Sequence, residues 1–295
     1  MNRRDVLKGL FGAGAAAVLP WPIAAAVANA TDVALPFIPA TKAVADGDSF
    51  IPELWAQEAL TILNENLVIG NLIHRDLDYS IAKYGDVVNI RRPGTFQIAH
   101  KGTRAKPMNV AVQLDQWFYN SFTIKDGETN QSFSELSRKY LLPSMAAMAH
   151  SIDDTIFGCA HDGIQGRPVA HSVIDARQKL NVNKAGVMNR NLIVTPTCKV
   201  KVGSDGHGRT LGFDTFDFQD VHDGLAFHRD AVALVTRPIN TPSTIGVLSH
   251  VANHNDISMR VVMQYDCYRQ GIVFNFDVLA GTALLDPSMC VALRK

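Results

Sequence analysis

Two parts of the chain place apolar residues at helical spacing. After Pro52, which suits the first turn of a helix, they recur every three or four residues as far as Gly70. Ser132 and Glu135 form a capping-box pattern, and the apolar positions that follow predict a longer helix as far as Phe157. At 1.5 Å per residue this helix spans about 40 Å, the scale of a whole domain.

Two further features concern helices. Pro143 lies inside the long helical pattern and should kink it, because proline removes a backbone hydrogen bond. A shorter helix is expected over residues 167–179, with Val173, Ile174 and Leu180 facing inward.

The region between the first two helices has the alternating pattern of strands. Val87–Arg92 is followed by Pro93–Gly94, and from Val110 to Ile124 the apolar residues keep one parity, which predicts one long strand. The connection over residues 99–107 is basic and contains few apolar residues. We expect a long two-stranded arm. Because an isolated ribbon is only marginally stable in water, the arm needs a surface on its own domain or on a neighbouring subunit.

Short runs rich in β-branched residues predict further strands at 192–196, 231–236, 257–265 and 272–279. Residues 203–212, which contain several glycines, are expected to form a loop. Helices and strands together predict an α+β fold.

Composition argues against some classes of protein. Lys and Arg number 28, as do Asp and Glu, so the formal net charge is zero. A protein that grips nucleic acid through its phosphates usually has a basic excess, whereas zero net charge lets like subunits approach one another. The cysteines are far apart and form no C-x-x-C pair, so we expect reduced thiols in packed positions, with disulfides as the alternative. They are Cys159, Cys198, Cys267 and Cys290.

The N-terminus has the features of an export signal. Arg3 and Arg4 match a twin-arginine motif, residues 9–19 are small and apolar, and Ala28 and Ala30 have the spacing of a cleavage site. This pattern is typical of a Tat leader. The alternatives are an alanine-rich N-terminal arm and a leader added by a misplaced start codon.

The candidates for chemistry do not meet the requirements of their sites. Gly203–Arg209 lacks the spacing of a phosphate loop, and His250 and His254 lack the glutamate of H-E-x-x-H and are expected in a loop. Asp153 and Asp154 are expected on a solvated helix face. Three His–Asp pairs are close in the chain, so their side chains seldom face one reacting atom: His161–Asp162, His222–Asp223 and His228–Asp230. We expect no enzyme, and no catalytic, cofactor-binding or metal-binding residue.

Basic residues gather on the two-stranded arm. They are Arg91, Arg92, Lys101, Arg104 and Lys106. The zero net charge argues against a grip on DNA. We expect these side chains to contact carboxylates of an adjacent subunit, or to keep the edge of the arm soluble.

Five strings stand in a definite order along the chain. They are residues 82–91, 191–196, 225–231, 265–266 and 271–274. None is a chemical motif, but together and in this order they resemble the P22-type coat protein group within the HK97-like phage capsid fold. The resemblance covers most of Ile51–Lys295.

The resemblance implies a division of the chain into a long helix-bearing body, an extended β-hairpin and a second domain. The expected parts are an N-terminal arm or Tat-like leader (1–50), an N-arm helix region (51–85), an E-loop (86–130), a peripheral domain with its spine helix (131–168), an axial domain (169–255) and return strands of the peripheral domain (256–295).

The resemblance also implies a function. The expected protein is a major capsid protein that self-assembles into the icosahedral head of a tailed bacteriophage, in the host cytoplasm. Implied partners are further copies in pentamers and hexamers, a scaffolding protein, a portal protein and double-stranded DNA without sequence specificity. The alternatives are a Tat-exported periplasmic protein and an encapsulin-like shell protein.

Overall fold

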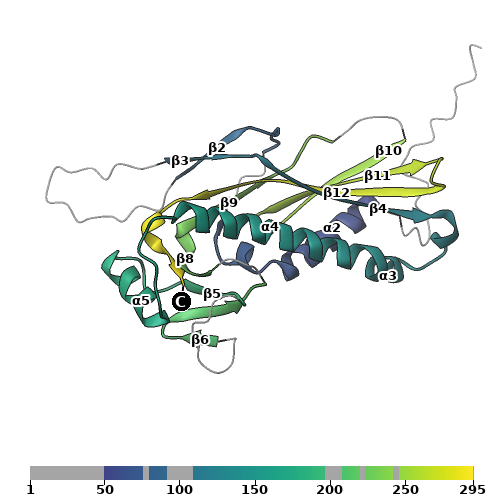
Figure 1. Ribbon diagram of the computed structural model, residues 1–295. Coiled ribbons are helices and arrows are strands. Elements are labelled where there is room, and N and C mark those ends of the chain that lie inside the picture. Colours follow the sequence, from purple (N-terminus) through teal and green to yellow (C-terminus); the bar gives the residue numbers. More distant parts are fainter. Residues whose placement is uncertain are drawn as a thin grey trace, which may run out of the picture. The chain divides into compact units, whose positions relative to one another are not determined.

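The computed structural model describes residues 50–75, 80–91, 109–196, 208–219, 223–241 and 246–294, all within the unit Ser49–Lys295 (Figure 1). These residues form helices and sheets, which confirms the predicted α+β class. The predicted leader residues Arg3, Arg4, Ala28 and Ala30 lie outside the described residues.

The larger sheet is built around β12, the longest of its strands. β12 pairs antiparallel with β4, β11 and β9, while β10 and β1 complete the sheet (Figure 1). The strands are β1 His74–Arg75, β4 Gln116–Lys125, β9 Val232–Arg237, β10 Val247–His254, β11 Ile257–Asp266 and β12 Gly271–Leu284. The strands predicted at 231–236, 257–265 and 272–279 are thus confirmed as β9, β11 and β12.

Two helices, α2 (Pro52–Asn66) and α4 (Leu142–Gly163), pack against one face of this sheet (Figure 1). Because side chains alternate along a strand, Phe274 and Phe276 of β12 point to the same face and join the core beneath the helices. The ring centroid of Trp55 in α2 lies 4.5 Å from that of Phe274, so aromatic packing fixes α2 on the sheet.

α2 ends at Asn66, before the predicted end at Gly70. Leu67 has a ψ of 124°, outside the helical region, and Ile69–Asn71 form the 3₁₀ turn η2. Backbone N–H groups of this turn donate to a carboxylate of α4 instead of continuing the helix. The prediction was wrong here because the tertiary partner, and not the apolar spacing, decides where α2 ends.

The long helical run begins where predicted, since Ser132 and Glu135 form the capping box. It consists of α3 (Phe133–Leu136), the π-helical turn η4 (Ser137–Leu141) and α4. Pro143 lies in the first turn of α4, where a missing N–H costs little, and the irregularity in hydrogen bonding falls in the π-helical turn before it. The run continues to Gly163, beyond the predicted end at Phe157.

A five-stranded sheet packs against α5 (Val173–Val182). Its strands are β5 Arg190–Val194, β6 Gly208–Thr210, β7 Phe213–Asp217, β8 Gly224–His228 and β13 Cys290–Leu293. The strand predicted at 192–196 is confirmed as β5. The helix begins at Val173 and not at Arg167, because Ser172 accepts a hydrogen bond from the backbone N–H of Asp175 and caps it there. Ile174 is 57% exposed, so its predicted inward orientation was wrong.

The predicted long strand over Val110–Ile124 is two strands. β3 (Asn109–Gln113) pairs with β2 (Val87–Arg91) in a two-stranded ribbon, whereas β4 pairs with β12. The apolar parity runs unchanged through both strands, so the pattern alone did not reveal that the partner changes at Leu114. The arm is therefore the β2–β3 ribbon, and β4 belongs to the larger sheet.

Candidate assembly surfaces

The base of the β2–β3 ribbon is anchored on the larger sheet. Ile90 of β2 and Val112 of β3 are buried in a cluster with Val235 and Leu279 of the sheet. A Cβ atom at Gly281 of β12 would lie 2.3 Å from the carbonyl oxygen of Gln113, so this close crossing requires glycine. The ribbon therefore starts from a fixed base.

This base lies on the face opposite the helices. Leu279 is one residue away from Val278, which packs in the core under α2 and α4, so the side chains of the two residues point to opposite faces. At the foot of the ribbon, Gly85 has a φ of 90° and its N–H donates to the carbonyl of Leu114 at 2.7 Å. The ribbon base and the helices thus occupy opposite faces of one sheet.

The predicted contact residues fall mostly beyond this base. Arg91 is exposed, ends β2 and is paired with Asn109. The other four lie in the stretch between β2 and β3, outside the described residues: Arg92, Lys101, Arg104 and Lys106. Their inter-subunit contacts stay a prediction.

A second surface, which the sequence pattern did not predict, lies next to the ribbon base. Trp117 and Tyr119 of β4 are 49% and 71% exposed. Trp117 lies directly opposite Leu279 on β12, and directly paired residues share a face, so both aromatic side chains lie on the ribbon's side of the sheet. The signal was present in the sequence, because these two aromatic residues occupy the parity that otherwise carries polar residues.

A charged pair lies beside these aromatic residues. Asp277, paired with Tyr119, is buried and accepts hydrogen bonds from Arg260 of β11, with Nη2 to Oδ2 at 2.7 Å. Asn275 donates to the same carboxylate oxygen at 3.0 Å. Burial raises the pKa of Asp277, although Arg260 favours its ionised form. Arg260 also donates to the backbone carbonyl of Asn240, in the loop after β9, so both charges have partners within the chain and the pair offers no free charge for catalysis.

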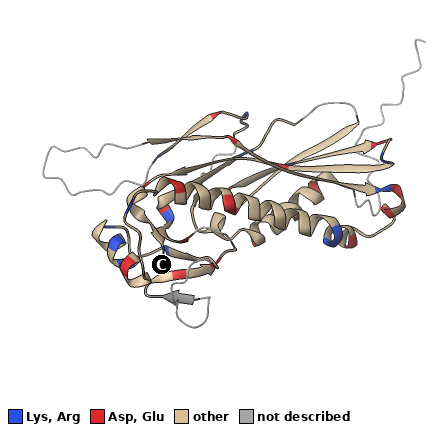
Figure 2. Cartoon of the chain, viewed as in Figure 1, with Lys and Arg blue, Asp and Glu red and all other residues tan. Residues whose placement is uncertain are grey.

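Acidic residues predominate on the two main helices. α2 contains three glutamates and α4 three aspartates, and neither helix contains Lys or Arg (Figure 2). The ribbon segment between Arg91 and Asn109, in contrast, contains no Asp or Glu. In a chain of zero net charge, α2 and α4 thus carry acidic residues and the ribbon segment carries basic ones. α2 and α4 therefore present no Lys or Arg side chain to a phosphate group.

One of these aspartates corrects a prediction. Asp153 was expected to be solvated, but it is 1% exposed and accepts hydrogen bonds from the N–H groups of Val68 and Gly70, at 2.7 and 2.8 Å. Burial raises its pKa to about 6, although these N–H groups favour the carboxylate. Because these donors are backbone groups of the turn after α2, Asp153 links this turn to α4, and we do not assign it the role of an acid–base catalyst.

The histidine candidates do not converge on a site. His250 and His254 lie in β10 and not in a loop, so that prediction was wrong, and His250 contacts Glu53 of α2 at 3.7 Å. The Nδ1 atom of His161 lies 3.5 Å from Oδ1 of Asp162, and Nδ1 of His228 lies 3.7 Å from Oδ2 of Asp230. His222 lies outside the described residues. Within the described ranges, no group of His, Cys, Asp and Glu side chains could hold a metal ion.

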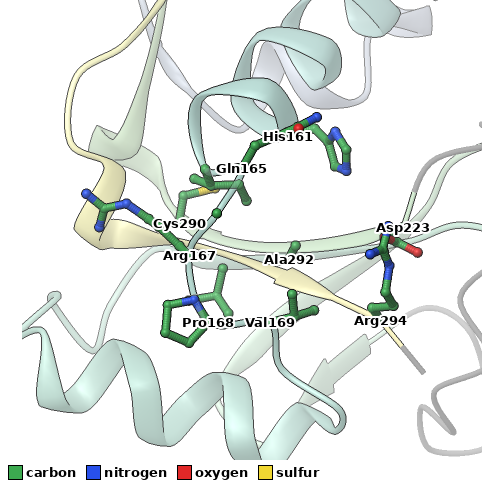
Figure 3. Close-up of a pocket in the computed structure, with 12 residues that line it drawn as sticks. His161, Gln165, Arg167, Pro168, Val169, Asp223, Cys290, Ala292 and Arg294 are labelled. Carbon is green, nitrogen blue, oxygen red and sulfur yellow. The ribbon is translucent and has the colours of Figure 1, made fainter.

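A small cavity of about 150 Å³ lies between the end of α4 and β13 (Figure 3). Arg294 and Asp223 form an ion pair on one side, with Nε to Oδ2 at 2.7 Å, while Arg167 lies on the other side (Figure 3). Burial raises the pKa of the Cys290 thiol to about 12, which keeps it protonated and unreactive. The cavity therefore lacks an activated nucleophile.

The cysteines only partly match their prediction. Cys159, Cys267 and Cys290 are free thiols, and Cys198 lies outside the described residues. Cys290 is buried and Cys159 half-buried, but Cys267 is exposed at the turn between β11 and β12, so a packed position was wrong for it. In the part of the chain that the structure covers, no helix is long and apolar enough to cross a membrane.

No family model and no curated protein sequence matches the chain. Several solved structures are similar in backbone. A structure from Mycobacterium phage Che8 has 15% identity and a TM-score of 0.47, covering 77% of this chain and 91% of that chain. A virus-like particle from Pyrococcus furiosus has 12% identity and a TM-score of 0.48, covering 82% and 98%. The capsid of cyanophage P-SCSP1u has 11% identity and a TM-score of 0.44, covering 77% and 87%. At this level the likeness by itself carries no conclusion about function.

Proposed function

We propose that this chain is a structural shell subunit, a major capsid protein with the HK97-like fold. The observation that carries the proposal is the β2–β3 ribbon, whose base is fixed on the sheet while the segment beyond Arg91 holds four of the five predicted basic contact residues. A ribbon of two strands gains stability from a surface, and a neighbouring copy supplies one.

The chemistry of the described residues supports a structural role. The buried carboxylates, Asp153 and Asp277, are tied to backbone N–H groups and to Arg260, and the Cys290 thiol is held protonated. None of them combines a nucleophile with a base and an oxyanion site, as acyl transfer requires. Their hydrogen bonds tie neighbouring elements of the subunit to one another.

Several finer features belong to the same proposal. The proposed group is the P22-type coat proteins. In this proposal α4 is the spine helix, the β2–β3 ribbon is the E-loop, and α5 with the five-stranded sheet is the core of the axial domain. The proposed partners are other copies in pentamers and hexamers, a scaffolding protein, a portal protein and packaged DNA. Assembly is proposed to occur in the host cytoplasm.

The direct test is assembly. Residues from Thr31 onward, expressed with and without a candidate scaffolding protein, should form capsomers or closed shells in negative-stain electron microscopy. A variant that lacks Gln97–Pro107 should fold with the same circular dichroism and yet form no shells. A monomer at high concentration, even with the scaffolding protein present, would overturn the proposal, and shells from the deletion variant would refute the role of the ribbon.

The leader pattern supports a second candidate, an exported protein. Arg3, Arg4, Ala28 and Ala30 fit a Tat leader, which a cytoplasmic shell subunit does not need. Cell fractionation of the full chain discriminates between the two. A periplasmic pool whose N-terminus is Thr31 would favour export, whereas cytoplasmic particles that keep Met1 would favour the shell subunit.

A further inference from the structure

An open groove lies beside α5, between this helix and the residues that lead into β13. Its volume is about 400 Å³, and ten residues line it. Four of them also line the small cavity of Figure 3 and form the wall between the two hollows: Arg167, Pro168, Cys290 and Val291. Small-molecule sites in proteins have volumes of roughly 300–1,000 Å³, so the groove is large enough to hold a ligand.

One side of α5 forms a wall of the groove. Asp175, Gln178, Lys179 and Val182 line it, and their spacing of three or four residues places them on the same side of the helix. Leu180 belongs to another side of α5 and is buried in the core with the five-stranded sheet. The sheet thus holds α5 in place, and the wall that faces the groove is fixed without an occupant.

Apolar side chains line both sides of the groove. Val182 of α5 faces it from one side, and Pro287 of the 3₁₀ turn η6 (Pro287–Met289) and Val291 of β13 line the other side. Val291 is buried, but Val182 is 79% exposed. Covering Val182 removes apolar surface from water, which is favourable. The groove therefore suits an apolar chain.

The charged residues of the groove leave one cation without a counter-charge. Nζ of Lys179 lies 2.9 Å from Oδ2 of Asp175 and also donates to the carbonyl of Val169, so these two charges balance. Among the residues that the structure describes, the side chain of Arg167 makes no hydrogen bond and no ion pair. Figure 3 shows Arg167 directed away from the ion pair of Arg294. Arg167 is thus available to bind an anionic group.

The size of the groove favours a small molecule over a protein. At the ~30 Å³ that a water molecule occupies, its volume corresponds to roughly 13 atoms. A protein–protein interface involves roughly 20–30 residues on each side, whereas ten residues line the groove. A straight-chain carboxylate of about ten carbons has this size, an apolar chain and a single anionic group.

We propose that the groove between α5 and β13 binds an aliphatic carboxylate such as decanoate. The chain covers Val182, Pro287 and Val291, and the carboxylate accepts charge-assisted hydrogen bonds from the fork of Arg167. The inference goes beyond the proposed function and is independent of it, because one chain supplies every residue of the groove. An occupant that contacts α5 and β13 at once should also raise the thermal stability of the chain.

The first test measures binding to the full chain by equilibrium dialysis with radiolabelled decanoate, below the concentration at which it forms micelles. Decanoate should bind saturably, and octanoate should bind more weakly by roughly fourfold for each methylene group removed. Decyltrimethylammonium has the same chain with a cationic head and should not displace decanoate. If decanoate does not bind, or if the cationic compound displaces it as well as unlabelled decanoate does, the inference fails.

The second test removes the cation. Arg167→Gln should weaken decanoate binding by about tenfold or more, and Arg167→Lys, which keeps the charge, should lose less. The matched control is Arg177→Gln, because Arg177 is an exposed arginine of α5 that does not line the groove. All three variants should keep the circular dichroism of the unsubstituted chain. Equal affinities of Arg167→Gln and Arg177→Gln would show that Arg167 does not hold the carboxylate and would overturn the inference.

The third test concerns the apolar wall. Val182→Ser should weaken decanoate binding severalfold, whereas Ile174→Ser should not, because Ile174 is an exposed apolar residue of α5 outside the groove. If both variants bind alike, the chain of decanoate does not lie along α5 and the inference fails. Because dialysis does not require shells, saturable binding to a chain that forms no shells would overturn the proposed function alone.

Discussion

The carboxylate of Asp153 in α4 accepts a hydrogen bond from the backbone N–H of Gly70 at 2.8 Å. Its second oxygen accepts from the N–H of Val68 at 2.7 Å. The turn after α2 is held from the other side by Arg75, whose Nε donates to the carbonyl of Gly70 at 2.8 Å. Asp153 and Arg75 together fix the end of α2 between α4 and the sheet.

This arrangement predicts a pH-dependent stability. Burial raises the pKa of Asp153 from 3.8 to about 6 in the folded chain, so between these values only the folded state holds the proton. The contribution of Asp153 to the free energy of unfolding is fully present below pH 3.8 and is lost as the pH rises through about 6. The slope is about 1.4 kcal/mol per pH unit.

Asp153→Asn, which does not titrate, tests this prediction. Urea unfolding of both chains from about pH 4.5 to about pH 7.5 should show the unsubstituted chain gaining stability over the variant as the pH falls. His150 affects the pKa of Asp153, so the comparison is repeated in a His150→Gln background. Parallel stability curves for the two chains would contradict the prediction.

The ion pair between Arg260 and Asp277 predicts an asymmetric response to substitution. Asp277→Ala should lower the free energy of unfolding by about 3 kcal/mol, because it leaves a largely buried guanidinium without its partner. Arg260→Met/Asp277→Leu replaces both charges and should recover most of the loss. Chemical denaturation measures both variants. A double variant that is less stable than Asp277→Ala would show that the pair itself is strongly stabilising.

Gly281 predicts a way to detach the ribbon from the sheet. Gly281→Ala places a Cβ 2.3 Å from the carbonyl oxygen of Gln113, so the ribbon base must shift, and the lost packing should cost about 1–3 kcal/mol. The matched control is Gly158→Ala in α4, which meets nothing within 4 Å and should stabilise the chain by about 1 kcal/mol. Limited proteolysis should cut the ribbon faster in Gly281→Ala alone; equal rates would refute the close crossing.

The capping box predicts a smaller, local effect. Ser132→Ala removes the acceptor for the N–H of Glu135 and should cost about 1 kcal/mol in the free energy of unfolding. Ser134→Ala, two residues further on, removes the contact between the Ser134 and Ser132 hydroxyls but keeps the bond from Glu135, and serves as the control. Thermal unfolding followed by circular dichroism measures both. If Ser134→Ala is the more damaging, the cap does not determine the start of the helix.

The sequence predicted the elements whose signals are local. The capping box of Ser132 and Glu135 marked the start of the long helix, and apolar alternation located β9, β11 and β12. The end of α2 and the start of α5 were misplaced for different reasons. Asp153, which lies far away in the chain, decides where α2 ends, and nothing in the sequence near α2 indicates this partner. The Ser172 cap of α5 is a local signal, which the prediction from apolar spacing missed.

The sequence by itself determined the α+β class, the main helices and strands, and the basic character of the segment between β2 and β3. Only the tertiary structure decided which strand each alternating run pairs with, and so separated β4 from the ribbon at Leu114. It also decided that Asp153 is buried and that Trp117 and Tyr119 are exposed. The physical reason is that periodicity fixes which side chains share a face, whereas burial depends on what covers that face, and the covering elements are distant in the chain.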